Sequence, residues 1–434
     1  MDMKNYTAGF ARLDMTPPLG IALGGSWAAR KATGVLDPLY VNAVAFGDGE
    51  KAAVLLVMDL LGIYSSEGYT WPKDIEKELG LPENSVILCS THTHTGPVIR
   101  NDELYDKWLY RRLKDAAAMA LEDRKPVTDV QWVQQRAEGM TFVRRYKLSD
   151  GTVMTNPAGT YAEMIVGPAC HNDDTMRVIR ILREDAPEIM LTNFQSHPDN
   201  IGGTLISADY PGAFRNRVEQ LKENTHCVYL DGCEGQMVIG PRGPGVVKTP
   251  ASHEKATTYG KKLADVAISM MDRTVSTDMT GLSFGQLAVS LKTKRDPSRV
   301  PESQRIIQLY GEDRWEEYAP SKKLANYMVA EARKIVALEK TQEDYRDTAV
   351  SAIAFCGLAL VGLPGEPFNE VGVQIRGNSK FPATCALCQA NGCHGYYPTA
   401  EGYDQGGYES YNTPYVKGTA EQLADTADKL LASL

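Results

Sequence analysis

The stretch Val86-Ile-Leu-Cys-Ser-Thr-His-Thr-His-Thr-Gly-Pro97 decides the interpretation of this chain. Its apolar start predicts a short buried strand, and Gly96-Pro97 ends the segment. In α/β folds, ligands bind beyond the carboxyl ends of strands. His92 and His94 follow such an end, and side chains two residues apart on extended backbone project to one side. Neutral imidazole is the commonest metal ligand, so this turn is a candidate metal site.

The alternative is a pair of surface histidines, or one core histidine with a hydrogen-bonded neighbour. The chain has 7 His among 434 residues, and two of them lie in this one turn. Because histidine is scarce elsewhere in the chain, the pairing favours a metal site.

Two further apolar runs end on a candidate ligand. Residues 189–194 lead into Gln195-Ser-His197, and residues 350–362 lead into Leu363-Pro-Gly-Glu366. We expect each run to be a single strand. A fourth run, 226–230, leads into Asp231-Gly-Cys-Glu-Gly235. Helical patterns at 102–123, 257–271 and 419–434 alternate with the strands. The sequence predicts an α/β fold, mixed sheets with flanking helices, and a metal site at the carboxyl ends of strands.

Composition places the chain among soluble globular proteins, with 43% hydrophobic and 23% charged residues. We expect one catalytic domain over 1–434, with residues 296–347 as a helical elaboration within it. The net charge of -9 argues against a nucleic-acid partner. The sequence has no apolar run long enough to span a bilayer and no signal-peptide pattern at its start, so we expect a cytoplasmic protein without a membrane partner.

The 8 cysteines suit a reducing compartment. Cys385 and Cys388, with Cys393 nearby, could form half of a zinc site. The sequence has no second CxxC pair, so buried thiols are the favoured interpretation.

The segment 391–415 is dense in glycine and tyrosine and has little regular periodicity. Loops carried on a rigid scaffold often form binding sites. We therefore expect this segment to contribute site residues; it contains His394, Tyr396, Tyr397, Tyr403 and Tyr408.

Several motifs in a specific order and spacing resemble the catalytic domain of the neutral/alkaline non-lysosomal ceramidase family. The resemblance runs from Ala8 to about Tyr415. The segments that carry it are Ala8-Gly-Phe-Ala-Arg-Leu-Asp-Met-Thr-Pro-Pro18, Ser90 to Pro97, Asp173 to Ile181, Ser196-His197, Ile206-Ser-Ala-Asp-Tyr-Pro-Gly212, Val361 to Glu366, and Gly395-Tyr-Tyr-Pro-Thr399 to Tyr408-Glu409.

The resemblance implies one zinc ion per chain, although another divalent transition metal would suit similar ligands. It implies His92, His197, Glu366 and Tyr396 as the metal ligands, the last on resemblance alone. It also implies that His94 faces the substrate, that Tyr408 hydrogen-bonds the oxygen of the scissile amide, and that Arg144 lies at the substrate site.

One departure changes the expected substrate. Val238 stands where ceramidases of this family carry a serine. We therefore expect hydrolysis of a C–N bond in a small soluble amide by metal-activated water. His94, Asp209 or Asp59 would act as the base, although Asp209 could instead stabilise the turn before Pro211.

Other readings of the same residues remain. His394 is expected to support the site rather than bind metal, and Cys233 is a possible nucleophile without an obvious base. An esterase, lactonase, isomerase or lyase acting on a small polar substrate is an alternative function, as is a non-catalytic binding protein. The sequence does not predict an oligomeric state.

Overall fold

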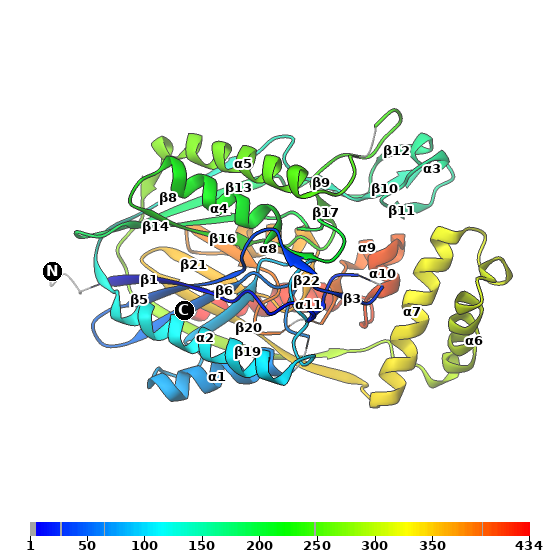
Figure 1. The fold of residues 1–434 in the computed structure, drawn as a ribbon, viewed down its shortest axis with the longest axis horizontal. Helices are drawn as coiled ribbons and strands as arrows, with labels where there is room; N and C mark the ends of the chain where they lie inside the picture. Colours follow the sequence, from blue (N-terminus) through cyan, green and yellow to red (C-terminus); the bar gives the residue numbers. More distant parts are fainter. Residues whose placement is uncertain (1–5, 27, 65, 247–248, 393) are drawn as a thin grey trace.

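Two β-sheets face each other in the computed structural model, which describes residues 6–26, 28–64, 66–246, 249–392 and 394–434 (Figure 1). The larger sheet has the strand order β16-β14-β13-β8-β1-β5-β6-β7, with β18 paired to β8. Its strands are β1 (Thr7–Asp14), β5 (Tyr40–Gly47), β6 (Ala52–Met58), β7 (Val86–Ser90), β8 (Lys125–Arg136), β13 (Thr175–Arg183), β14 (Glu188–Phe194), β16 (Thr225–Asp231) and β18 (Val275–Ser276).

The smaller sheet has the order β19-β20-β21-β23 and packs on one face of the larger sheet. Its strands are β19 (Leu282–Lys292), β20 (Tyr345–Phe355), β21 (Leu358–Gly362) and β23 (Ala383–Leu387). The core between the sheets is apolar because both contribute aliphatic and aromatic side chains, including Phe46, Leu55, Ile179, Ile353 and Leu360. Burying a large apolar side chain stabilises the fold by roughly 1.5–3 kcal/mol.

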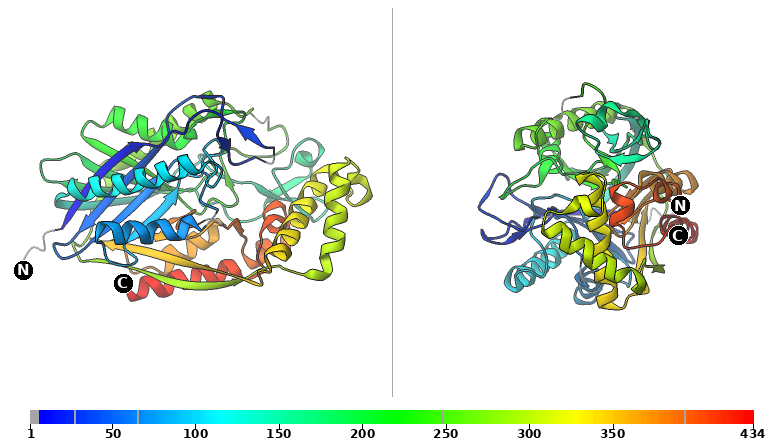
Figure 2. Two further views of the ribbon diagram at one scale, coloured as in Figure 1. Left: turned by 60° about the horizontal axis from the view of Figure 1, so that its bottom comes forward. Right: turned by 90° about the vertical axis from the view of Figure 1, so that its right-hand side faces the viewer.

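Helices cover the outer faces of both sheets (Figures 1 and 2). The larger sheet packs against two pairs of helices, and the smaller sheet packs against α8 and α11. The covering helices are α1 (Glu67–Leu79), α2 (Glu103–Glu122), α4 (Asp209–Leu221), α5 (His253–Met270), α8 (Asn369–Asn378) and α11 (Thr419–Ser433). In α2, the Asp102 carboxylate accepts hydrogen bonds from the amides of Leu104 and Tyr105, which caps the helix.

Most neighbouring strands of these two sheets are antiparallel, but three pairs within them are parallel: β6 with β7, β14 with β16, and β21 with β23. Parallel strands end at the same edge of a sheet, and the segments that follow these three pairs meet at one end of the molecule. The predicted mixed α/β fold and the placement of the candidate ligands after strands are confirmed.

The prediction of one strand over 350–362 is wrong, because β20 and β21 form a hairpin there. The turn is Cys356-Gly357, with φ angles of 47° and 79°. Two consecutive residues with positive φ are typical of a tight hairpin turn. The sequence predicts one strand here because β20 and β21 are both buried on both faces beside the turn, so the apolar pattern continues from one strand into the next.

Residues 296–347 contain α6 (Val300–Gly311) and α7 (Lys322–Thr341), and the last three residues already belong to β20. This helical pair lies beyond the strand ends, at the opposite end of the molecule from the N-terminus (Figures 1 and 2). Within the described residues, every helix is too short or too polar to cross a membrane.

Short elements complete the chain around the same end. They are β2 (Ala22–Leu23), β3 (Arg30–Lys31), β4 (Gly34–Val35), β9 (Phe142–Val143), β10 (Arg145–Leu148), β11 (Val153–Thr155), α3 (Thr160–Glu163), β12 (Ile165–Pro168), β15 (Leu205–Ile206), β17 (Met237–Val238), β22 (Glu366–Pro367), β24 (Tyr396–Tyr397), α9 (Ala400–Gln405) and α10 (Tyr408–Asn412).

Candidate metal centre and active site

The turn after β7 holds His92 in a left-handed conformation, with a φ of 64°. Non-glycine residues adopt this region when the surrounding structure enforces it. The enforcement comes from Asp59, which accepts a hydrogen bond of 3.2 Å from the Thr91 hydroxyl and pairs with the buried guanidinium of Arg215 at 2.8 and 2.6 Å. Since its oxygens are engaged in this way, we assign Asp59 to supporting the turn rather than to proton transfer.

Three imidazoles are each oriented by a contact between Nδ1 and a backbone carbonyl oxygen. His92 Nδ1 lies 2.6 Å from the carbonyl oxygen of Leu61, His94 Nδ1 lies 3.0 Å from that of Gly25, and His197 Nδ1 lies 3.1 Å from that of Glu234. A carbonyl only accepts, which favours a proton on each Nδ1. At His92 the Gln389 side-chain amide also lies 2.9 Å from Nδ1, and its otherwise unpartnered oxygen must face that proton for this tautomer to hold. This leaves each Nε2 with a free lone pair, which is the tautomer that a metal-binding histidine needs.

Two carboxylates meet these imidazoles. Glu366 Oε2 lies 3.4 Å from His197 Nε2 and 3.6 Å from His92 Nε2, and Glu234 Oε1 lies 3.8 Å from His92 Nε2. One ligand atom from each of these four buried residues lies within 4.8 Å of the others. The three imidazoles of His92, His94 and His197 form a second group with the same spacing.

The four-residue group fits a metal ion. His197 Nε2, Glu366 Oε2 and both Glu234 oxygens have no hydrogen-bond partner among the described residues. Ligand atoms bound tetrahedrally to zinc at about 2.0–2.2 Å lie roughly 3.3–3.6 Å apart, close to the separations found here. Buried polar atoms that converge without donors are what a cation site requires.

Electrostatics favour the metal-binding protonation states. Burial lowers the pKa of His92 to about 4 and also lowers the pKa of His197, so both imidazoles are neutral at pH 7. Burial alone would raise the pKa of Glu366, but the neighbouring His92, His197 and Arg144 outweigh it and hold that pKa below its usual range. His92, His197 and Glu366 therefore offer two neutral nitrogen donors and an ionised carboxylate, whereas burial and the nearby Glu366 raise the pKa of Glu234, the fourth member of the group.

Tyr396 lies beside Glu366 because β22 and β24 pair in parallel, with these two residues in register. Gly365 makes this pairing possible. Its φ is 69°, and a Cβ there would lie 2.4 Å from the carbonyl oxygen of Gly395. The sequence alone did not distinguish Tyr396 from Tyr397, whereas the structure lines the cavity with Tyr396 and buries Tyr397 in the core.

Arg144 is held rigidly beside Tyr396. Its Nε donates to Glu409 at 2.5 Å, and its Nη2 donates to the Gly235 carbonyl at 2.7 Å. Its guanidinium carbon lies 5.4 Å from the centre of the Tyr396 ring. Tyr408 packs edge-on against that ring at 5.8 Å, and its hydroxyl accepts from Asn412 at 2.9 Å.

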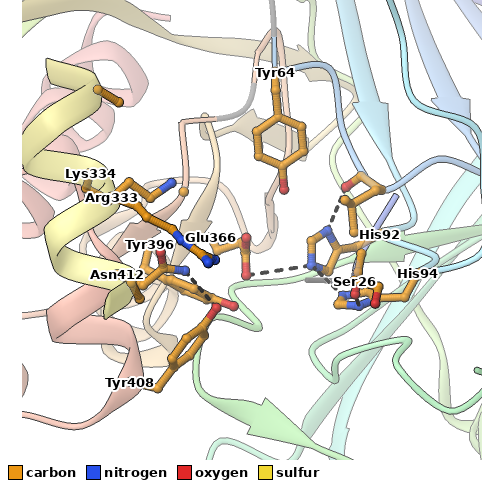
Figure 3. A pocket seen from close by; sticks show the side chains of 15 residues that line it. Ser26, Tyr64, His92, His94, Arg333, Lys334, Glu366, Tyr396, Tyr408 and Asn412 are labelled. Atoms are coloured by element: carbon orange, nitrogen blue, oxygen red, sulfur yellow. Dashed lines mark hydrogen bonds and ion pairs between the residues drawn. The ribbon is translucent and has the colours of Figure 1, made fainter. Parts of the chain in front are cut away.

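Two adjoining cavities open over the candidate ligands, with volumes of about 460 and 800 Å³. Both are lined by Gly25, His94, Tyr396 and Tyr408. The smaller one also contains His92 and Glu366, and Figure 3 shows Arg333 reaching into it from α7. The larger one reaches Arg144, His197 and, on the α7 side, Lys322 and Lys323. The helical elaboration thus forms a basic wall of the site.

Some predicted residues lie apart from this centre. Asp209 begins α4 with a φ of 54°, accepts from the amides of Asn200 and Tyr210 at 2.8 and 2.6 Å, and lines neither cavity. This is the turn-stabilising role weighed as its alternative. Cys233 is 1% exposed, and burial raises its pKa to about 12, which disfavours a nucleophilic thiolate.

The remaining candidates are placed as follows. His394 hydrogen-bonds the Tyr69 hydroxyl and lines neither cavity. Val238 lies in β17, which pairs with β9. Cys393 lies outside the described residues.

Glu234 is the residue that the sequence interpretation missed as a candidate ligand. Its side chain is fully buried and faces His92. It comes three residues after β16. The rule that selected His92, His197 and Glu366, an apolar strand followed by a polar residue and a breaker, also applies to Glu234.

Comparison with known proteins identifies the fold. No family model and no curated protein sequence matches the chain. Among solved structures, neutral ceramidase from Pseudomonas aeruginosa aligns with 100% of this chain and 75% of that chain, at a TM-score of 0.75 and 15% identity. The chain has a neutral-ceramidase-like fold. A structure described as ceramidase complexed with C2 aligns with 99% of this chain and 75% of that chain, at a TM-score of 0.73 and 14% identity. The fold implied by the sequence motifs is thereby confirmed.

Proposed function

We propose that this chain is a zinc-dependent hydrolase that cleaves the amide bond of a small soluble substrate carrying an anionic group. The observation that carries the proposal is the convergence of His92, His197 and Glu366 beneath two adjoining cavities that are both lined by Tyr396 and Tyr408. The neutral-ceramidase-like fold supports amide hydrolysis, because the similar structures are described as ceramidases.

His92, His197 and Glu366 would hold the ion, with Tyr396 or Glu234 completing the set. A zinc ion bound by such ligands polarises a carbonyl and lowers the pKa of a bound water to about 7. The residues around it supply the rest of the chemistry.

Tyr408 and His94 are the proposed catalytic residues. The Tyr408 phenol lies at the cavity wall and would donate to the amide oxygen as negative charge develops there. The side chain of His94 is 15% exposed, its Nδ1 proton is fixed on Gly25, and its Nε2 lies 3.3 Å from His92 Nε2. It would accept the proton of the attacking water and pass it to the leaving nitrogen.

Arg144 is proposed as a positioning residue. Two of its donor groups are already bonded to Glu409 and Gly235, and its guanidinium lies over the Tyr396 ring. It would fix Tyr396 beside Glu366. The anionic group of the substrate would instead face the basic wall, where Arg333 and Lys334 line the smaller cavity.

Isotope labelling tests the reaction class. The protein would be incubated in ¹⁸O water with N-acyl amino acids, neutral amides, and matching esters and lactones. We expect amide turnover with one ¹⁸O atom in the released acid, and its loss in His92→Ala and His197→Ala. Turnover without incorporation of ¹⁸O into the product would indicate an isomerase or lyase. Turnover of esters or lactones but not of amides would exclude amide hydrolysis as the activity. A protein that purifies without bound metal and turns over none of the panel would favour a binding protein.

A further inference from the structure

Glu234 belongs to a further group of candidate ligands that contains no imidazole. Asp231, Glu234 and Cys388 each offer one ligand atom, and these atoms lie within 4.8 Å of one another. Asp231 ends β16, and Cys388 follows β23. The Cys388 amide donates to the Asp231 carbonyl at 3.1 Å, so the backbone fixes these two residues against each other.

The two carboxylates are buried without sufficient donors. Asp231 is 3% exposed and Glu234 is 0% exposed, and none of their four oxygens has a hydrogen-bond partner among the described residues. The amides of Ser196 and Gly232 lie toward Asp231 and the Cys388 thiol toward Glu234, which lowers the two pKa values. Burial raises both pKa values, together with the charge of Glu234 in the case of Asp231 and the charge of Glu366 in the case of Glu234. A buried carboxylate without partners costs several kcal/mol, so this pocket calls for a proton or a cation.

We infer that Asp231, Glu234 and Cys388 bind a second divalent cation, and that Glu234 is shared between it and the first centre. Glu234 is the one residue common to the two carboxylate-containing ligand groups, and its two oxygens allow one to face each ion. Ions bridged in this way lie about 3.5–4 Å apart in two-metal sites. The sharing of Glu234 rests on the proposed metal centre, whereas binding by Asp231 and Cys388 does not.

The ligand chemistry selects the class of cation. One thiolate with two carboxylates suits zinc or a similar transition metal. Magnesium and calcium prefer oxygen ligands alone. The second ion would neutralise the buried carboxylates and fix Glu234 against His92.

Metal stoichiometry tests the inference directly. The full-length protein would be equilibrated with zinc, desalted and measured by plasma mass spectrometry. We expect about two zinc ions per chain for wild type and about one for Asp231→Asn and Cys388→Ser. Cys385→Ser is the matched control, because Cys385 is an equally buried thiol three residues away and outside the ligand group. It should retain both ions.

Cobalt substitution provides a second measurement, and its wild-type arm does not depend on the folding of any variant. Only the second site contains a thiol, so a thiolate-to-cobalt charge-transfer absorption reports on that site alone. We expect the band in wild type and in Cys385→Ser, and its loss in Cys388→Ser.

A single ion in wild type, with no thiolate band, would overturn the inference and identify Asp231 and Glu234 as a protonated pair. In that case the proposed hydrolase would still stand if His92→Ala lost the one remaining ion.

Discussion

At the scale of single residues, Gly365 controls the spacing of the centre. It precedes Glu366, has a φ of 69°, and leaves no room for a Cβ beside the Gly395 carbonyl. Gly365→Ala should separate β22 from β24 and displace the Glu366 carboxylate. We expect zinc affinity to fall roughly 10–100-fold, as for loss of a group that orients a metal ligand, measured by competition with a chromophoric chelator.

Gly139→Ala is the matched control for this change. Gly139 has a φ of 74° and open space around a Cβ, so its replacement tests the backbone strain alone. It should cost roughly 1 kcal/mol of unfolding free energy with unchanged zinc affinity. Equal zinc affinities for the two variants would show that Gly365 does not set the ligand geometry.

Individual site residues could be predicted only where the sequence pattern indicates that the residue lies just after the end of a strand. His92, His197 and Glu366 each follow an apolar strand, and the structure brings them together. Glu234 follows the same rule, but Asp231 stands directly at the end of the same strand, so the pattern alone does not single out Glu234. The role of Asp209 could not be predicted, because an acidic residue before Pro211 suits a turn and a proton acceptor equally well.

At the scale of elements, the sequence does not predict which strands pair with each other in a sheet. Apolar runs predicted most strands, but periodicity carries no information on which strand lies beside which. The largely antiparallel order of the larger sheet therefore emerged only from the structure. The hairpin at Cys356 was missed because a two-residue turn between two fully buried strands interrupts no apolar pattern.

The helix α7 is joined to α10 through a buried lysine. Lys294 Nζ donates to the Tyr411 carbonyl at 2.6 Å and lies 3.3 Å from Glu331 on α7. Burial lowers the pKa of Lys294 to about 8, although Glu331 partly offsets this. Between pH 8 and 10 the unfolded chain keeps this proton and the folded chain releases it, so this group makes stability rise with pH.

We expect the stability of wild type relative to Lys294→Met to rise by roughly 1–2 kcal/mol from pH 8 to pH 10. Urea unfolding at several pH values measures the difference. The exposed Lys340, on the same helix, serves as the control, and Lys340→Met should show a difference that does not change with pH. A flat difference for Lys294→Met would mean that its amine stays charged throughout.

The same helix should determine substrate charge preference. Arg333 reaches from α7 into the cavity, whereas Lys340 lies outside both cavities (Figure 3). For an amide that carries a carboxylate, we expect Arg333→Gln to raise KM about tenfold, a loss of about 1.4 kcal/mol of binding, with kcat little changed.

Two comparisons isolate the charge effect. A neutral amide should show no change in KM with Arg333→Gln, and Lys340→Gln should leave both substrates unaffected. Equal changes for charged and neutral amides would indicate that Arg333 shapes the cavity without recognising charge.

At the scale of the whole molecule, the metal centre joins the two sheets. His92 and His197 follow strands of the larger sheet, and Glu366 follows a strand of the smaller sheet. An ion bound by all three stabilises the folded chain, because the unfolded chain does not assemble the site. The metal ion joins the two sheets only at one end of the molecule, whereas the apolar core lies between the sheets themselves. The fold should therefore persist without the ion.

Removal of the metal should therefore lower stability without unfolding the protein. At a free zinc concentration 1,000 times the Kd, binding contributes about 4 kcal/mol. For a chain of 434 residues this corresponds to a Tm decrease of about 4–5 °C on chelation. Differential scanning calorimetry with and without chelator measures it. Chelator should lower the Tm of His92→Ala by less than it lowers that of wild type, because this variant has already lost the ion of the first centre and keeps only the one inferred at Asp231, Glu234 and Cys388. If chelator lowered the Tm of wild type and His92→Ala equally, the stabilising ion would be bound elsewhere, and the two sheets would be held together by their apolar core alone.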